Sequence, residues 1–145
     1  IVTPMFYVVL EDGHIYISSV NKYRKKIEHL IANPKISVSI SNDGSNAKRQ
    51  KSIQIIGKAD VSFDQELLTK VHWKIIDKYW WDLAGNDELR AAAFKGVHTP
   101  NRAIIKVIPN KKSPTSWDFG KMVQMYERGV WFNEAYEMSK PYDVS

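Results

Sequence analysis

Residues 3–19, TPMFYVVLEDGHIYISS, decide the class of fold. The runs 3–10 and 14–18 are rich in β-branched and aromatic side chains, which favour β-strands. Between them stands Glu-Asp-Gly at 11–13, and an Asp-Gly turn between two such runs is typical of a β-hairpin. We therefore expect the chain to begin with two antiparallel strands and to be built on an antiparallel sheet.

The rest of the chain adds strands and helices without a regular alternation of the two. Hydrophobic spacing and turn signals predict strands over residues 36–40, 52–63 and 102–109, and helices over 21–32, 64–80 and about 89–94. Asn21 and Asp64 can cap the first two of these helices. The second has one apolar stripe, formed by Leu68, Val71, Ile75, Ile76 and Tyr79. Gly57 predicts a kink or bulge in its strand. This order predicts an α+β fold with an antiparallel sheet or barrel and helices at its ends. We expect one domain over residues 1–145, with a helical C-terminal segment over 121–145.

The composition limits the classes of function. The 145 residues include no cysteine, which excludes disulfides, thiolate metal ligands and a cysteine nucleophile. No apolar run approaches the roughly 20 residues that span a bilayer, and the N-terminus lacks the features of a secretory signal. We expect a cytoplasmic protein with no membrane partner. The net charge of +5 suits an anionic partner, whether nucleic acid, anionic lipid or a phosphorylated small molecule.

Motifs for self-contained catalysis or for metal binding are missing from the sequence. The glycines form neither a dinucleotide fingerprint nor a P-loop, and no G-x-S-x-G element marks a serine hydrolase. The histidines are scattered without the spacing of metal ligands, at His14, His29, His72 and His98. We expect no metal site and assign no catalytic residue, so an enzyme with this sequence would depend on a bound cofactor.

The expected helix over residues 21–32 begins with a cluster of four cations. These are Lys22, Arg24, Lys25 and Lys26. A helix N-terminus carries roughly half a positive charge, so each nearby cation is unfavourable by about 0.3 to 1 kcal/mol. A phosphate bound there, with the hydroxyls of Ser18 and Ser19, would remove the conflict. The alternative is that the long side chains extend into water as an ordinary solvated face.

Four segments in sequence order resemble the pyridoxamine phosphate oxidase-like proteins, the flavin-binding split-barrel family. They read MFYVVLEDGHIYISS, KKIEHLIANPKISVSI, IQIIGKADV and RAIIKVIPNKKSPTSWDFGK. The most specific parts are Lys-x-x-x-Leu-x-x-Asn-Pro, which starts at Lys26, and the late Ser-Trp-Asp around Trp117. The resemblance covers nearly the whole chain.

The resemblance implies an antiparallel six-stranded split β-barrel that forms a homodimer, with the cofactor in a groove at the subunit interface. It implies FMN as the cofactor, with the deazaflavin coenzyme F-420 as the alternative. The cofactor-binding residues that we expect are Ser18, Ser19, Arg24, Lys25, Lys26, Gln54 and Trp117. The first five would hold the phosphate, Gln54 would line the groove, and Trp117 would lie near the interface.

The resemblance further implies a flavin-dependent oxidoreductase that acts on a small organic substrate. We do not expect oxidation of pyridoxamine phosphate itself, because the arginine set for that flavin and substrate is incomplete. A protein that only carries or senses flavin or haem remains an alternative. Nucleic-acid binding is a further alternative, suggested by the basic runs KYRKK, KRQK and NKK, but the 16 acidic residues and the lack of a recognised motif argue against it.

Overall fold

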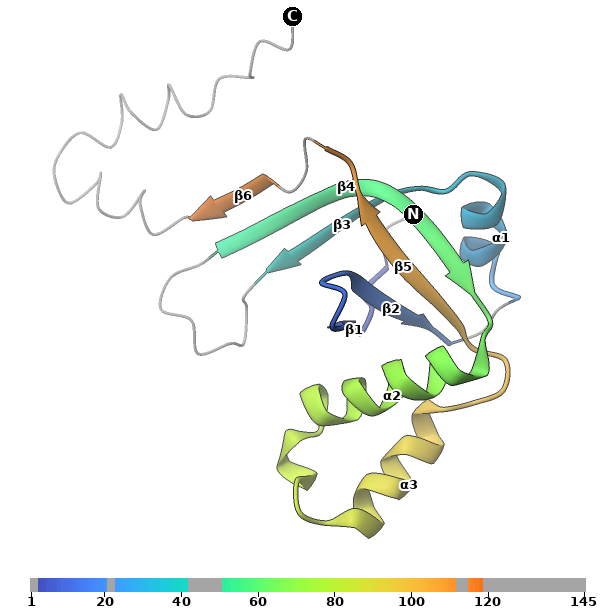
Figure 1. Ribbon diagram of the computed structural model, residues 1–145, viewed down its shortest axis with the longest axis vertical. Helices are drawn as coiled ribbons and strands as arrows, with labels where there is room; N and C mark the ends of the chain where they lie inside the picture. The colour runs from blue at the N-terminus through green and yellow to red at the C-terminus, as the bar shows by residue number, and fades with distance from the viewer. Residues whose placement is uncertain (1–2, 21–22, 42–50, 112–114, 119–145) are drawn as a thin grey trace, which may run out of the picture. The chain divides into compact units, whose positions relative to one another are not determined.

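The computed structural model describes residues 3–20, 23–41, 51–111 and 115–118 (Figure 1). Its strands are β1 (Tyr7–Val9), β2 (Ile15–Ser19), β3 (Lys35–Ser41), β4 (Lys51–Ser62), β5 (Ala103–Pro109) and β6 (Thr115–Asp118). Its helices are α1 (Lys25–Ala32), α2 (Gln65–Tyr79), the 3-10 helix η1 (Trp81–Leu83) and α3 (Asp87–Val97). The predicted α+β class is confirmed, whereas the helix expected over 121–145 lies outside the described residues.

The chain divides into two compact units, residues 1–37 with 56–111 and residues 38–55 with 112–145. The strand order is β1-β2-β5-β4-β3, and β6 pairs with β4. In the first unit, β2 pairs with both β1 and β5, and the second half of β4 pairs with β5, all antiparallel. In the second unit, the first half of β4 pairs with β6, also antiparallel. The antiparallel framework predicted from the first hairpin is therefore present.

The turn between β1 and β2 is the one that the sequence predicts. Gly13 has φ +76°, a left-handed conformation that an L side chain rarely adopts. Leu10 N–H donates to His14 O at 3.2 Å, and Gly13 N–H donates to Leu10 O at 2.9 Å, which closes the hairpin. The carboxylate of Asp12 accepts hydrogen bonds from the Tyr16 hydroxyl at 2.7 Å and the Lys106 ammonium at 2.9 Å. The turn is thereby fixed to β5.

Helix α2 covers one face of the sheet of the first unit, beside α3 (Figure 1). Asp64 caps it, because its carboxylate accepts a hydrogen bond from Leu67 N–H at 2.8 Å. The predicted apolar stripe is confirmed by the fully buried Leu68, Val71, Ile75 and Ile76. They pack against side chains from β1, β2, α3 and β5, namely Val8, Tyr16, Val97 and Ile104.

The opposite face of this sheet is also buried. Along β5, residues Ala103, Ile105 and Val107 alternate with residues that face α2, and each is at most 3% exposed. Ile27 of α1 is fully buried as well. Since both faces of β5 are buried over residues 103–105, this part of the strand lies at the centre of the first unit.

Two helix boundaries differ from the prediction. Helix α1 begins at Lys25 and not at residue 21, because Arg24 is extended (φ −67°, ψ 139°) and occupies the N-cap. The expected cap, Asn21, lies outside the described residues. Helix α3 spans Asp87–Val97 and is longer than predicted, because the Asn86 side chain accepts a hydrogen bond from Leu89 N–H at 3.0 Å and starts the helix earlier.

Candidate functional site

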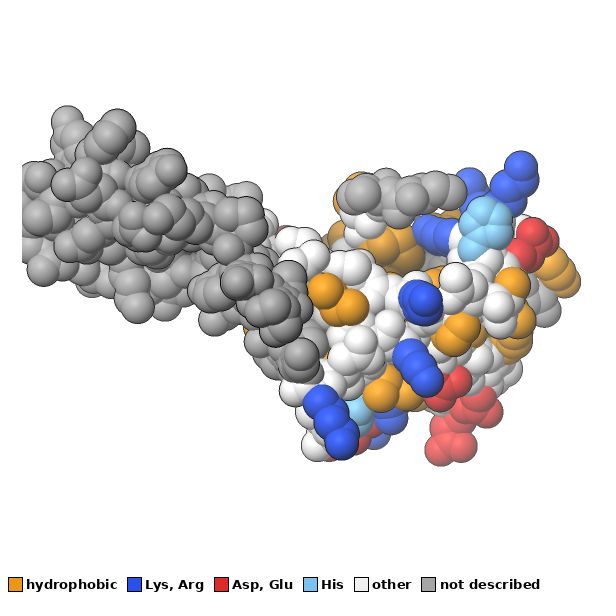
Figure 2. Space-filling view, turned by 90° about the horizontal axis from the view of Figure 1, so that it is seen from above, with side chains coloured by type: hydrophobic (Ala, Val, Ile, Leu, Met, Phe, Trp, Pro, Cys, Tyr) orange, Lys and Arg blue, Asp and Glu red, His pale blue; other side chains and the backbone are white. Residues whose placement is uncertain are grey.

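The cations predicted to bind a phosphate lie at the start of α1. Arg24 and Lys25 are exposed, whereas the side chain of Lys26 is half-buried. Figure 2 shows Lys and Arg side chains close to a histidine over this part of the surface. Burial lowers the pKa of the Lys26 ammonium, and the positive charge of Arg24 lowers it further. Two cations therefore repel each other at the N-terminus of a helix.

The partner of the Lys26 ammonium is not an acid. Its Nζ donates to the thioether sulfur of Met5 at 3.2 Å, which is a weak acceptor. Within residues 3–20, 23–41, 51–111 and 115–118, no carboxylate forms an ion pair with Lys26 or Arg24. Nor does any side chain cap the first turn of α1. Among the described residues, the site thus has positive charge and a first helical turn without a side-chain cap, and an anion with several oxygen atoms fits this donor set.

The two serines of β2 point to opposite faces of the sheet, because successive residues in a strand alternate. The Ser18 hydroxyl lies 2.8 Å from His72 Nε2, on the face that α2 covers. Ser19 is fully buried and stands opposite Ala103. The two hydroxyls therefore do not converge on one point, although both lie only a few residues before Arg24.

Gln54 and Trp117 belong to the second unit. In the register of β4 and β6, Gln54 stands opposite Thr115 and Ser52 stands opposite Trp117. Trp117 is thus within two positions of Gln54 on the neighbouring strand. The roles of Gln54 in the cofactor groove and of Trp117 near the interface stay predictions, as does their position relative to the cations of α1.

The structure also contains a polar cluster that the sequence did not predict. His72 is fully buried in α2, and its Nδ1 lies 2.9 Å from Nδ1 of His98, just after α3. Burial lowers the pKa of His72 to about 4, with smaller contributions from Arg102 and His98. The sequence does contain a signal for this cluster, because His72 lies on the apolar stripe of α2. A buried imidazole at such a position needs a hydrogen-bond partner.

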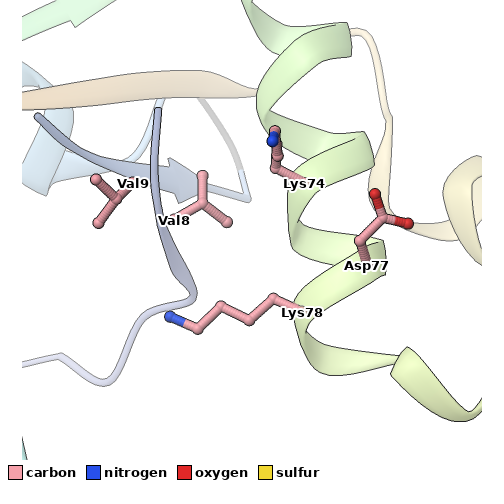
Figure 3. A pocket seen from close by; sticks show the side chains of 5 residues that line it. All are labelled: Val8, Val9, Lys74, Asp77 and Lys78. Atoms are coloured by element: carbon pink, nitrogen blue, oxygen red, sulfur yellow. The ribbon is translucent and has the colours of Figure 1, made fainter. Parts of the chain in front are cut away.

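A shallow pocket lies between β1 and α2, lined by Val8, Val9, Lys74, Asp77 and Lys78 (Figure 3). Its volume is about 270 Å³. The Lys78 ammonium reaches across to β1, donates to the carbonyl of Tyr7 at 3.1 Å and lies 3.3 Å from the centre of its ring. This lysine is therefore engaged in fixing the edge strand β1 and is not free to bind a ligand.

The described residues contain neither a helix that could span a membrane nor a cluster of metal ligands. None of the helices described is both long and apolar enough to cross a bilayer. Within the same residues, no three side chains of histidine, cysteine, aspartate or glutamate gather around a point that could hold a metal ion.

Comparison with solved structures identifies the fold. A conserved hypothetical protein from Mycobacterium tuberculosis superimposes with a TM-score of 0.62 and 21% identity, over 83% of this chain and 70% of that one. A protein of unknown function from Agrobacterium tumefaciens gives a TM-score of 0.55 and 12% identity, over 78% of this chain and 42% of that one. No protein-family model matches the sequence, and no curated protein does.

A Listeria innocua protein provisionally named a pyridoxamine 5'-phosphate oxidase has 25% identity and a TM-score of 0.47, over 77% of this chain and 73% of that one. The two superpositions with the Mycobacterium tuberculosis and Agrobacterium tumefaciens proteins support the fold alone, and membership of the pyridoxamine phosphate oxidase-like family stays a proposal. Identities as low as these establish fold and not activity.

Proposed function

We propose that this protein is a homodimeric oxidoreductase of the split-barrel type that binds FMN, or the deazaflavin coenzyme F-420, and acts on a small organic substrate. The observation that carries the proposal is the half-buried ammonium of Lys26, which faces Arg24 and a thioether and has no carboxylate partner among the described residues. A phosphate dianion would supply the missing negative charge and accept hydrogen bonds from both side chains.

The residues proposed to hold the phosphate are Arg24, Lys25 and Lys26, together with the first N–H groups of α1. Ser19, which precedes them on β2 and is fully buried, is proposed as a further contact. Ser18 remains a proposed ligand, and its hydroxyl also contacts His72. Gln54 and Trp117 are proposed to line the remainder of the cofactor groove.

A bound flavin or deazaflavin ring would supply hydride or electron transfer, so the protein needs no catalytic triad of its own. The chain's residues would bind and orient the cofactor. The cations at α1 fix its phosphate end, and the strands would exclude water from the ring. This division of labour agrees with a sequence in which no catalytic motif is found.

The proposal is tested by comparing FMN with riboflavin, which has the same ring without the phosphate. The parent protein is expected to bind FMN at least about 100-fold more tightly, since hydrogen bonds to charged groups contribute about 1.5 to 3 kcal/mol each. Lys26→Glu should abolish this preference. Lys95→Glu, which makes the same change of charge at an exposed position of α3, is the matched control and should leave it intact.

Fluorescence titration of the purified protein with each compound measures the effect. If Lys26→Glu retains FMN as tightly as the parent, the assignment of the phosphate site is wrong. A protein that binds flavin or haem but shows no turnover with a reductant and an oxidant would be a carrier and not an enzyme. Steeply salt-dependent binding of single-stranded DNA without affinity for any cofactor would instead support nucleic-acid binding.

A further inference from the structure

A hydrogen-bonded line of three polar side chains connects three elements of the first unit. Ser18 Oγ of β2 lies 2.8 Å from His72 Nε2 of α2, and His72 Nδ1 lies 2.9 Å from Nδ1 of His98, which follows α3. Ser18 is 6% exposed and His72 is fully buried. These residues are 54 and 26 positions apart in sequence, so the line joins segments that only the fold brings together.

The contacts fit a neutral His72. A neutral imidazole carries one N–H and one lone pair, so one ring nitrogen donates and the other accepts. The contact between the two Nδ1 atoms holds one proton, which either ring can provide. If both rings were charged, two N–H groups would face each other and the contact would break.

The surroundings of His72 oppose a positive charge. The guanidinium of Arg102, from the segment before β5, and the His98 ring after α3 both disfavour its protonation. The Arg102 Nε is buried without a hydrogen-bond partner, and among the described residues no carboxylate pairs with Arg102, His72 or His98. The ring of Phe94 stacks on His98 at 4.8 Å and restricts its movement. A proton on His72 therefore meets positive charge and no compensating acid.

We propose that Ser18, His72 and His98 form a pH-sensitive latch, which fastens the C-terminal end of β2 to α2 and to the end of α3 while at least one of the two imidazoles is neutral, and which opens when both carry a proton. The end of β2 leads within a few residues to the cations of α1. The latch therefore also regulates the cofactor site, a consequence that rests on the proposed function.

The direction of the pH dependence follows from the difference between the two states. The pKa of His72 falls from 6.5 to about 4 in the folded protein, so the unfolded chain takes up this proton at higher pH. The contribution of neutral His72 to the stability of the folded protein is complete above pH 6.5 and is lost as the pH falls from 6.5 to about 4. A difference of this size corresponds to roughly 300-fold in the folding equilibrium constant.

Denaturant unfolding of the full chain at several pH values between 7.5 and 4 tests the latch. His72→Gln keeps a hydrogen-bonding group but cannot titrate, so its folding equilibrium should depend less on pH than that of the parent, by up to roughly 300-fold over this window. His29→Gln removes an exposed histidine of α1 and should keep the parent's dependence. Equal dependence in the parent and His72→Gln would overturn the proposal.

Nuclear magnetic resonance of the parent protein gives a second reading in case His72→Gln does not fold. The His72 ring signals should remain those of the neutral form at pH 5.5, and a folded-state titration near pH 6.5 would contradict the latch. For the cofactor site, FMN affinity should decrease as the pH is lowered, and this decrease should be steeper in the parent than in His72→Gln. Should neither protein bind FMN at any pH, the proposed function fails while the unfolding and resonance measurements still decide on the latch.

Discussion

At the scale of single residues, Gly57 occupies a position where the neighbouring backbone leaves no room for a side chain. Gly57 of β4 stands opposite Pro109 in the register with β5, and a Cβ atom on Gly57 would overlap the backbone carbonyl of Ile108. The backbone of a central strand pair cannot move away as a flexible side chain could. The glycine at which the sequence predicts a kink or bulge is thus required by the close approach of two strands.

Gly57→Ala should therefore destabilise the protein by about 3 kcal/mol or more, which corresponds to a fall in melting temperature of about 10 °C. Gly96 in α3 is the matched control, because a Cβ atom there meets nothing within 4 Å. Gly96→Ala should stabilise the helix by up to about 1 kcal/mol. Thermal unfolding of both variants measures these opposite signs, and a Gly57→Ala variant as stable as the parent would refute the close-approach argument.

At the scale of whole elements, the caps decide where the helices begin. The Asp64 carboxylate accepts from Leu67 N–H, and the residues after it bury the apolar stripe of α2 in the core. Asp64→Ala should cost about 1 kcal/mol of unfolding free energy, measured in urea. Asp82→Ala, which removes an exposed carboxylate from η1, should change stability by less than about 0.5 kcal/mol. Equal losses in the two variants would argue against a capping role.

The elements with strong local signals were predictable from the sequence. The Asp-Gly turn at Gly13, the cap at Asp64 and the stripe of α2 each depend on neighbours in the chain, and the structure confirms all three. The start of α1 was misplaced, because helix propensity continues into residues that the extended Arg24 excludes. Strand β6 (Thr115–Asp118) is not among the strands predicted from spacing, because four residues show no periodicity and pairing with β4 alone defines them.

In the candidate site, too, the sequence predicts features that depend on neighbouring residues and misses those that depend on tertiary contacts. The cations of α1 were found because four like charges adjoin in the sequence, and the structure adds that Lys26 is half-buried without an acidic partner among the described residues. The latch was missed because Ser18, His72 and His98 lie on three distant segments. A histidine on an apolar stripe predicts a buried partner but does not identify it. Contacts of this kind depend on tertiary structure.

At the scale of the whole molecule, strand β4 belongs to both compact units, with residues 51–55 in one and 56–62 in the other. A continuous strand carries its hydrogen bonds through the boundary, so unfolding of one half weakens the pairing of the other. The single domain expected over residues 1–145 stays a prediction. The proposed dimer adds a second constraint, since its cofactor groove is completed only by a partner subunit.

A dimer of this kind should sediment at twice the monomer mass of 16.7 kDa and unfold in one transition. Association stabilises the folded state by mass action, so the unfolding midpoint should rise with protein concentration, and saturating FMN at 100 times its Kd should add about 2.7 kcal/mol. Calorimetry at several concentrations, with and without FMN, measures both effects. Two separate transitions, of which FMN moves only one, would show that the units fold independently. A concentration-independent midpoint together with a monomer mass would rule out the dimer, and the groove would then have to be formed within one chain.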